Sequence, residues 1–398
     1  MKKTPNLWLT KIFAASLLMV ACSNTKEPQK MSIEVKNYLN YARNEVVSVP
    51  FEDLKTFLSG KNEAHLRVLD SHGDNQLVQL QDLDDDKVFD ELLFLARVDA
   101  NSESHYKIVL DSTISIPETD AKAYSRFVPE RTDDYTWEND KVAFRTYGPT
   151  GQKEALEGVP GSTLSSGIDL WLKRTEKTII DKWYSEHLKE PGYYHIDHGE
   201  GYDPYHVGAS RGTGGLGVWH NDSLHVSKNF VNHKTLENGP LRTVFELSYE
   251  PWSPFGVQEI KRITLDKKSN FSKFEVFLKA SDDLPNYAIG ITLHNNQGTT
   301  KLNPEMGWYS HWETIDKSQV GEGVVIEPSA VDTAFARQSD VKDQSNLLVL
   351  AKPTEVLTYY AGFAWNKSGQ ITDKEDWEKL LNQQSQKIKS PLKVDLKN

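Results

Sequence analysis

Residues of two kinds alternate along Arg242-Thr-Val-Phe-Glu-Leu-Ser-Tyr249, which places Thr243, Phe245 and Leu247 on one face. This period of two is typical of a β-strand with one face against a core. The same pattern returns at 274–278 and 289–293. Many strand signals and few helix signals predict a mainly all-β chain, dominated by a large antiparallel β-supersandwich of the galactose-mutarotase type.

Strand signals at shorter intervals also fill residues 32–118, ahead of a boundary rich in proline and acidic residues. We expect a small N-terminal β-sandwich domain here and a large catalytic β-supersandwich domain over 122–398. Residues 179–188 predict a short helix. One clear helix is expected near the C-terminus, where Thr372 and Glu375 form a capping box before an apolar stripe.

The segment Asp82-Leu-Asp-Asp-Asp-Lys-Val-Phe-Asp-Glu91 spaces its aspartates as a calcium-binding loop does. Lys87, however, stands where such a loop requires the glycine of its sharp turn, and Leu93 stands where the closing glutamate belongs. The pattern therefore favours an acidic, solvated turn between two strands. A calcium site is the alternative.

Two lysines at the start, an apolar run and the ending Val-Ala-Cys22 indicate a lipoprotein signal peptide over 1–22, followed by a polar linker over 23–31. We expect lipidation of Cys22 and attachment to a bacterial membrane through the lipid. No acidic run follows Cys22, which favours the periplasmic face of the outer membrane. Cys22 is the only cysteine, so the sequence has no internal disulfide and no cysteine nucleophile.

The net charge is −11, and no basic run interrupts the sequence. Binding to nucleic acid depends on lysine and arginine that neutralise phosphates. Nucleic acid is therefore excluded as a partner.

Chemistry-bearing residues concentrate in the stretch from Tyr193 to His220, which holds four histidines, three carboxylates, four tyrosines, one arginine and many glycines. Such a mixture is poor material for an apolar core, because each buried polar group needs a partner. Gly208–Gly212 matches a serine-hydrolase elbow and Gly212–Gly217 a dinucleotide fingerprint, but both motifs need a helix next. A strand pattern follows instead, so both matches are rejected.

A uronic acid is a substrate class that this stretch could serve. Its carbon-bound proton becomes removable when the adjacent carboxylate is neutralised, and a base and an acid must then act on neighbouring carbons. Arg211 is the expected carboxylate clamp, with Arg145 as a further source of positive potential. The acid and base candidates are His195, His198, Tyr202, Tyr205 and His206.

Other residues of the stretch have supporting roles in this hypothesis. Asp197 or Glu200 could orient a histidine, Asp203 could contact the substrate, and Trp308 with Tyr309 and Trp312 could form an aromatic wall for a sugar ring. No cofactor is required. A divalent metal ion remains an alternative, with His195 and Asp197 on one face of a strand and His206, His220 or Glu200 completing the ligands.

Several longer motifs resemble those of an exported Bacteroidota family of formerly unknown function that includes the ulvan-pathway oligosaccharide dehydratase. They are Arg131-x-Asp-Asp-x-x-x-Glu-Asn-Asp140, Tyr147-Gly-Pro149, Gly167-Ile-Asp-Leu-Trp171, Tyr194-His-x-Asp-x-Gly-Glu-Gly201, Asp203-x-Tyr-x-Val-Gly208 and Arg211-Gly-x-Gly-Gly215. The resemblance covers almost the whole chain after the signal peptide. It implies a lyase that eliminates water from the terminal glucuronate or iduronate of sulfated oligosaccharides and leaves a 4,5-unsaturated uronate.

Two alternatives stay open at the level of the sequence. A polysaccharide lyase would use the same proton abstraction to break a glycosidic bond, and would shorten the oligosaccharide. A sugar-binding lipoprotein would bind the same anionic oligosaccharide and catalyse nothing. The density of histidine favours an enzyme, since sugar-binding surfaces need aromatic and amide groups more than proton carriers.

Overall fold

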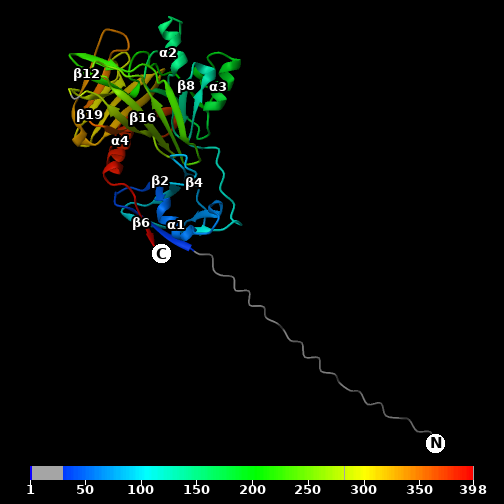
Figure 1. Ribbon diagram of the computed structural model, residues 1–398. Helices are drawn as coiled ribbons and strands as arrows, with labels where there is room; N and C mark the ends of the chain where they lie inside the picture. Colours follow the sequence, from blue (N-terminus) through cyan, green and yellow to red (C-terminus); the bar gives the residue numbers. More distant parts are fainter. Residues whose placement is uncertain (2–29, 282, 398) are drawn as a thin grey trace.

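The computed structural model describes residue 1, residues 30–281 and residues 283–397. The predicted signal peptide, the lipidated Cys22 and most of the predicted linker lie outside the described residues. None of the helices in the described part is both long and apolar enough to cross a membrane. Strands dominate the chain, as the alternating patterns predicted, and they form a small domain below a much larger one (Figure 1).

The small domain is a β-sandwich of two sheets. The order is β25-β1-β6-β3 in the first sheet and β2-β5-β4 in the second. Inward residues such as Ile33, Leu92 and Phe94 are fully buried between the sheets and the short helix α1 (Phe51–Leu58). The strands are β1 (Lys30–Asn37), β2 (Arg43–Pro50), β3 (Leu66–Leu69), β4 (Val78–Gln81), β5 (Glu91–Val98), β6 (Ser102–Leu110) and β25 (Lys393–Lys397).

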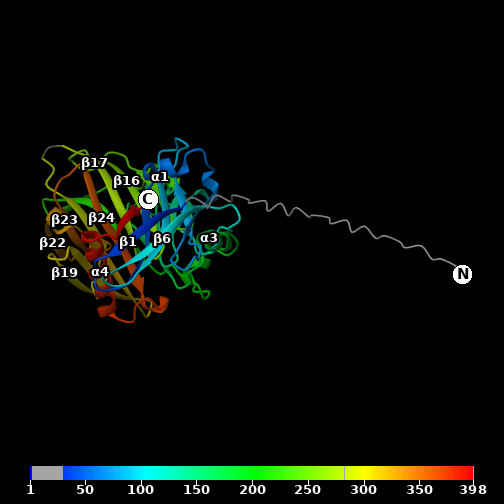
Figure 2. The ribbon, with the colours of Figure 1, turned by 90° about the horizontal axis from the view of Figure 1, so that it is seen from below.

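The C-terminal strand corrects the predicted domain boundary. Residues 122–398 were expected to form one domain, but β25 pairs with β1 of the small domain, with Val394 opposite Val35. The chain therefore leaves the small domain, builds the large one and returns. Both ends of the described main segment lie in the same sheet (Figure 2).

The large domain is built on an eight-stranded antiparallel sheet of order β14-β15-β16-β17-β24-β21-β20-β19. Its inner face carries the alternating apolar residues of the sequence pattern, among them Phe245, Val276 and Tyr359. The strands are β14 (Asn232–Glu237), β15 (Arg242–Ser248), β16 (Gln258–Asp266), β17 (Phe271–Lys279), β19 (Thr299–Asn303), β20 (Trp308–Ile315), β21 (Ser318–Ile326) and β24 (Val356–Trp365).

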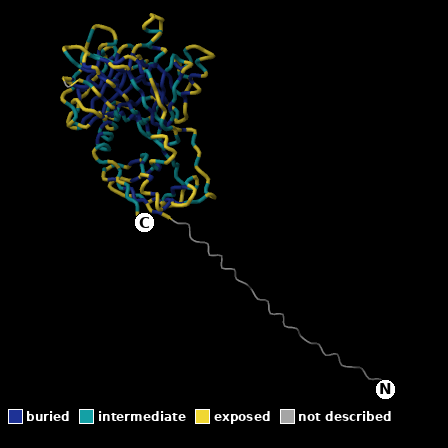
Figure 3. Tube along the Cα trace, in the orientation of Figure 1, coloured by how far each residue is buried: buried dark blue, intermediate teal, exposed yellow. Residues whose placement is uncertain are grey.

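Two five-stranded sheets cover this inner face and are joined by a bridge between Ile168 and Gly212. Their orders are β13-β12-β18-β23-β22 and β11-β10-β9-β8-β7. The largest hydrophobic core of the described chain lies between these layers (Figure 3). The strands are β7 (Tyr124–Val128), β8 (Asp134–Glu138), β9 (Ala143–Thr146), β10 (Asp169–Lys173), β11 (Gly201–Tyr202), β12 (Thr213–His220), β13 (Ser223–Val226), β18 (Tyr287–Thr292), β22 (Val331–Arg337) and β23 (Asn346–Ala351).

Four α-helices occur within the described residues, against one clear and one short helix predicted. The short one is confirmed as α3 (Ile180–Lys189), and α2 (Pro149–Leu156) is an addition, as is α1. The C-terminal helix is confirmed as α4 (Lys374–Lys389), but its N-cap is Asp373, whose side chain accepts a hydrogen bond from the Asp376 amide. Thr372 lies one residue earlier.

Helix α4 packs on the outer face of the eight-stranded sheet, where glycines of β21 allow close approach. A Cβ on Gly321 would lie 2.4 Å from the Trp377 ring. Because Gly321 and Gly323 face the helix, the alternate residues of β21, including Glu322, face the core. The register of this strand thus decides which side chains reach the interior.

Candidate acid–base site

A group of buried polar side chains interrupts the apolar core between the eight-stranded sheet and β12. His311 and Glu313 stand on one face of β20, and Glu322 lies opposite His311 on β21. Thr213 begins β12, and His294 follows the end of β18. The members of this group, here called the acid–base centre, are Tyr205, Thr213, His294, His311, Glu313 and Glu322.

Glu322 is the most deeply placed member of the acid–base centre. One of its carboxylate oxygens, Oε2, accepts hydrogen bonds from the Tyr205 hydroxyl at 2.7 Å and the Thr213 hydroxyl at 2.6 Å. The Nδ1 atom of His311 lies 3.5 Å from the other oxygen, Oε1. The glutamate is fully buried, so its charge is compensated only by these neighbours.

Glu313 and His294 form a second pair, with 2.6 Å between Glu313 Oε1 and His294 Nδ1. The other imidazole nitrogen of His294, Nε2, lies 2.9 Å from the carbonyl oxygen of His206. A carbonyl oxygen can only accept, so His294 Nε2 carries a hydrogen. The proton between His294 Nδ1 and Glu313 is then shared by this pair.

The two glutamates have pKa values displaced in opposite directions. Burial and the nearby Glu322 carboxylate raise the pKa of Glu313 well above its usual range. Burial alone would raise the pKa of Glu322 as well, but hydrogen bonding and charge from His311 lower it below its usual range. At neutral pH, Glu313 therefore holds a proton and Glu322 is ionised. Paired groups with pKa values pushed apart are the arrangement required for acid–base catalysis.

Two atoms of the acid–base centre have no hydrogen-bond partner within the described residues. They are Glu322 Oε1 and His311 Nδ1, both inaccessible to solvent, which lie 3.5 Å apart and interact through charge and at most a long hydrogen bond. One ligand atom from each of His294, Glu313 and Glu322 lies within 4.8 Å of the others. Two carboxylates and an imidazole suit a divalent ion such as zinc or manganese. These residues could hold such an ion.

The acid–base centre reaches solvent through His294, whose side chain is 16% exposed, while the other imidazole and both glutamates are almost completely covered. His294 has a positive φ of 42°, a conformation that non-glycine residues rarely adopt. Strain of this kind is typical of residues placed for function. The neighbouring His206 is half exposed and pairs with Asp343 at 3.0 Å.

The stretch from Tyr193 to His220 does not form one pocket. It contributes Tyr205 and Thr213 to the acid–base centre, and the His206 carbonyl to its rim. Two further groups of its predicted site residues lie elsewhere, around Arg145 and around Arg211.

Arg145 is the centre of a second buried cluster. It lies beneath α3, on the outer face of the sheet of order β11-β10-β9-β8-β7. Its guanidinium binds Asp169, with Nε at 2.8 Å, and Asp203, with Nη2 at 2.9 Å. His195 lies at the edge, with Nδ1 at 2.7 Å from the Asp203 carbonyl oxygen. Arg145 and Asp203 were expected to bind substrate, but here they satisfy each other. This set, with Asp134, is called the Arg145 cluster.

Burial raises the carboxyl pKa values of the Arg145 cluster. The pKa of Asp134 rises to about 6 and that of Asp203 to about 6, in each case opposed by Arg145. For Asp169, burial and the charge of Asp203 together raise the pKa to about 7. Arg145, with a smaller contribution from Arg131, therefore compensates three carboxyl groups that are partly protonated near neutral pH.

Arg211 does not reach the surface, so its side chain is not placed to bind a substrate carboxylate as predicted. It is 1% exposed, and its Nη1 donates to the Ser166 hydroxyl at 2.8 Å and the Leu216 carbonyl at 3.2 Å. Burial lowers its pKa to about 10. A Cβ on Gly290 would lie 2.4 Å from Arg211 Cγ, so the glycine makes room for this side chain.

Other predicted residues have local structural contacts. Asp197 was expected on a strand with His195, but His195 ends a 3-10 turn and Asp197 accepts the Gly199 amide at 2.8 Å and pairs with Arg174. The strand geometry of the predicted metal site is therefore wrong. Glu200 pairs with Lys182 at 2.8 Å, and His198 stacks on Tyr193.

The predicted aromatic wall is packing material. Trp308 is 1% exposed, and its indole nitrogen donates to Asn382 of α4 at 2.8 Å. Tyr309 lies in the main core. Tyr202 donates its hydroxyl to Asp316 at 3.0 Å, and His220 packs edge-on against Phe255. These residues do not join the acid–base centre.

The sequence reasoning missed His294, His311, Glu313 and Glu322. One signal was present, because His311-x-Glu313 places two ionisable residues on one face of a strand whose neighbours are aromatic. An ionisable pair at inward positions is costly unless it has a partner or a function. Glu322 gives no such signal, since it lies between glycines in Gly321-Glu-Gly323.

The fold and the site define a mainly β, two-domain protein with a buried acid–base centre. Residues 35–394 match the family model described as a domain of unknown function (DUF4861), and the chain belongs to this family. It is also 41% identical over 390 residues to uncharacterized protein P7 of Formosa agariphila, covering 96% of this chain and 97% of that protein.

Solved structures similar to this chain come from Enterococcus faecalis. A protein in glycosyl hydrolase family 38 has a TM-score of 0.47 at 10% identity, and an alpha-mannosidase has a TM-score of 0.44 at 11% identity. In both cases 93% of this chain is covered. The chain spans just under half the length of those two proteins, at 47% and 46%.

Proposed function

We propose that this protein is an oligosaccharide dehydratase, a carbon–oxygen lyase that removes water from a non-reducing-end glucuronate or iduronate of ulvan oligosaccharides. The supporting observation is the acid–base centre, which holds a protonated and an ionised glutamate side by side. Glu322 is hydrogen-bonded to the buried Tyr205 hydroxyl, and Glu313 to His294, through which the centre reaches solvent. The substrate class is inferred from the family motifs described above.

The ionised side of the acid–base centre supplies the base. In the proposed reaction, Tyr205 takes the proton from C5 of the uronate as its own hydroxyl proton passes to Glu322 over the existing 2.7 Å hydrogen bond. Burial raises the pKa of Tyr205 well above its usual range, which Glu322 and Glu313 reinforce, so free tyrosinate does not accumulate. The proton must therefore move to Glu322 in the same step.

The protonated side supplies the acid. As the bond from C4 to its oxygen breaks, His294 donates a proton from Nε2 to the departing hydroxyl, and water leaves. Glu313 replaces that proton through His294 Nδ1. Glu322 then carries a proton, Glu313 is ionised, and His294 holds its proton on Nδ1. The starting state is restored when the Nδ1 proton returns to Glu313, Nε2 takes a proton from solvent and Glu322 releases its proton to solvent. Each assisted proton transfer of this type contributes a factor of about 10² to 10⁴.

Neutralisation of the substrate carboxylate is also required, because the charge that develops on removal of the proton spreads into it. The exposed His206, paired with Asp343 beside the His294 contact, lies in a suitable place for this role. A divalent ion held by His294, Glu313 and Glu322 would supply the same neutralisation, and these three residues would then be its ligands in place of the acid and base.

The experiment is incubation of the purified protein with saturated uronyl oligosaccharides, followed by mass and ultraviolet absorbance, with and without a chelator. A loss of one water with a new absorbance and unchanged chain length is expected. Shortened products would identify a chain-cleaving lyase instead, and unchanged substrate with measurable binding would identify a sugar-binding lipoprotein. If a chelator inhibits the reaction and added zinc or manganese restores it, the reaction depends on a divalent ion, and the restoring metal identifies that ion.

A further inference from the structure

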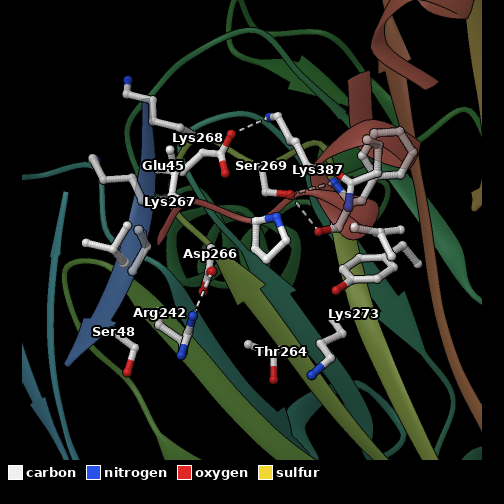
Figure 4. A pocket seen from close by; sticks show the side chains of 18 of the residues that line it. Glu45, Ser48, Arg242, Thr264, Asp266, Lys267, Lys268, Ser269, Lys273 and Lys387 are labelled. Carbon is white, nitrogen blue, oxygen red and sulfur yellow. Dashed lines mark hydrogen bonds and ion pairs between the residues drawn. The ribbon is translucent and has the colours of Figure 1, made fainter. Parts of the chain in front are cut away.

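A cleft of about 610 Å³ lies between the two domains, separate from the acid–base centre. Its floor is the outer face of β15, β16 and β17, its roof comes from β2 and β5, and α4 forms one wall (Figure 4). Glu322 faces the opposite, inner side of the same eight-stranded sheet. The sheet therefore separates the two places.

The lining of this cleft is basic in an acidic protein. Eight lysines and arginines line it, against four aspartates and glutamates, while the whole chain has a net charge of −11. Part of the positive charge is compensated, since Arg242 binds Asp266 through two nitrogens and Lys268 pairs with Asp140 at 2.7 Å. The positive charge that stays uncompensated determines which ligands the cleft attracts.

Three cations in the lining of the cleft lack full compensation by carboxylates. Lys141 contacts only the amide oxygen of Asn270, at 3.4 Å, and Lys267 donates to the backbone carbonyl of Ala121. Neither lysine forms an ion pair with any carboxylate of the described chain. Lys387 shares the single carboxylate of Glu45 with Arg43.

The electrostatic environment of Lys141 agrees with this geometry. Burial lowers the pKa of its ammonium group, and the positive charges of Lys387 and Lys268 lower it further, against the effect of Asp140. Burial also lowers the pKa of Lys267. An anion placed among these groups would remove the mutual repulsion and replace lost solvation.

The size and the remaining lining indicate a ligand larger than a small inorganic ion. Pockets of about 300 to 1,000 Å³ typically hold a whole small molecule. Tyr360 adds an aromatic ring, and Thr264, Ser269 and Gln383 add neutral hydrogen-bonding groups. Aromatic faces with hydroxyl and amide groups suit sugar rings. The charged groups of the lining then suit a sulfate or carboxylate on the sugar.

We propose that this interdomain cleft is a second binding site for an anionic oligosaccharide, which holds a sulfate ester or carboxylate between Lys141 and Lys387. The identity of the saccharide rests on the proposed function. The cleft would retain an oligosaccharide at the protein without taking part in the elimination, because the sheet separates it from Glu322. Both domains contribute, so binding also stabilises their contact.

The test is calorimetric titration with a chondroitin sulfate hexasaccharide, compared with the unsulfated hexasaccharide and with inorganic sulfate. Lys141→Gln removes an uncompensated charge, and Thr264→Glu adds a carboxylate to the floor. Both should weaken binding of the sulfated hexasaccharide at least tenfold. The matched control Lys279→Gln, at an exposed position of β17 outside the cleft, should leave it unchanged.

The outcomes separate this inference from the proposed function. Wild-type affinity in Lys141→Gln and Thr264→Glu would overturn the cleft site, whether or not dehydration occurs. Equal affinity for inorganic sulfate and the hexasaccharide would reject the saccharide and leave a simple anion site. Conversely, failure to dehydrate any uronyl oligosaccharide would overturn the proposed function, while tenfold weaker binding in both variants would still support the cleft.

Discussion

The acid–base centre and the Arg145 cluster are built from the same residue types and behave differently. Each contains buried carboxyl groups, a histidine near the surface and a tyrosine, which in the Arg145 cluster is Tyr194, whose hydroxyl accepts a hydrogen bond from Arg145 Nη1 at 3.4 Å. In the Arg145 cluster a guanidinium binds two of the carboxylates directly, at 2.8 and 2.9 Å. In the acid–base centre no arginine or lysine of the described chain is present, and two glutamates divide one proton between them.

This comparison shows how charge compensation distinguishes a structural cluster from a reactive one. In the Arg145 cluster the three carboxyl groups face the same guanidinium, and their pKa values stay close together at about 6 to 7. In the acid–base centre the pKa values of the two glutamates are displaced in opposite directions, so that one carboxyl is available as an acid and the other as a base. Unpartnered buried atoms do not separate the two clusters, since Asp203 Oδ1 lacks a hydrogen-bond partner among the described residues, as Glu322 Oε1 and His311 Nδ1 do.

The largest expected effect is that of Glu322→Gln on turnover. The amide preserves the shape but cannot accept the Tyr205 proton, so kcat for dehydration should fall by about 10³ to 10⁴, or about 4 to 5.5 kcal/mol of activation free energy. Steady-state absorbance assays measure this. The control Glu250→Gln, at an exposed position, should keep full activity, and a wild-type rate in Glu322→Gln would remove this glutamate from the mechanism.

In the Arg145 cluster, Arg145→Met should act on stability. It leaves Asp169 and Asp203 buried without their cation, and breaking a buried ion pair in this way costs about 3 kcal/mol or more. Urea denaturation measures the free energy of unfolding. Adding Asp203→Asn to Arg145→Met should recover part of the loss, and Arg97→Met at an exposed site serves as the control. If Arg145→Met is as stable as the wild type but inactive, the Arg145 cluster has a catalytic role, and the distinction between the two clusters is wrong.

His294→Asn should have an intermediate effect on activity. The variant removes the group that connects Glu313 to solvent, and loss of one assisted proton transfer lowers kcat by about 10²-fold. Asparagine also tolerates the positive φ at this position better than most residues. Unchanged KM with lowered kcat is expected. A change in KM alone would assign His294 to binding.

The smallest expected effect is a pH dependence of stability from the Arg145 cluster. The folded pKa of Asp169, about 7, lies above the unfolded value near 3.8, so the folded state binds the extra proton between these limits. Its contribution to stability is complete below the unfolded pKa and is lost as pH rises through 7. Lowering the pH from 8 to 6 should raise the free energy of unfolding by on the order of 1 kcal/mol. Asp169→Asn should flatten this dependence.

Much of the fold could be predicted from the sequence, because it depends on local alternation. The segment beginning at Arg242 became β15 with Phe245 and Leu247 buried, and the C-terminal helix shifted by only one residue at its cap. The strand β25 could not be assigned to the small domain. Its five residues give no indication of a partner strand at the other end of the chain.

The site was predicted only in part, for a physical reason. Polar residues adjacent in sequence were expected to share a pocket, but the chain from Tyr193 to His220 crosses several layers. Tyr205 reached the acid–base centre, while Arg211 entered the core beneath Gly290. The partners of Tyr205 come from β20, β21 and the end of β18, and only the sheet register brings them together.

The most direct measurement uses a saturated uronyl oligosaccharide labelled with deuterium at C5. Wild-type protein should release the label to solvent as the oligosaccharide loses one water, more slowly than with the unlabelled substrate, and Glu322→Gln should release neither. Loss of water and release of the label at the wild-type rate in Glu322→Gln would contradict the acid–base centre as the place where the carbon-bound proton is removed.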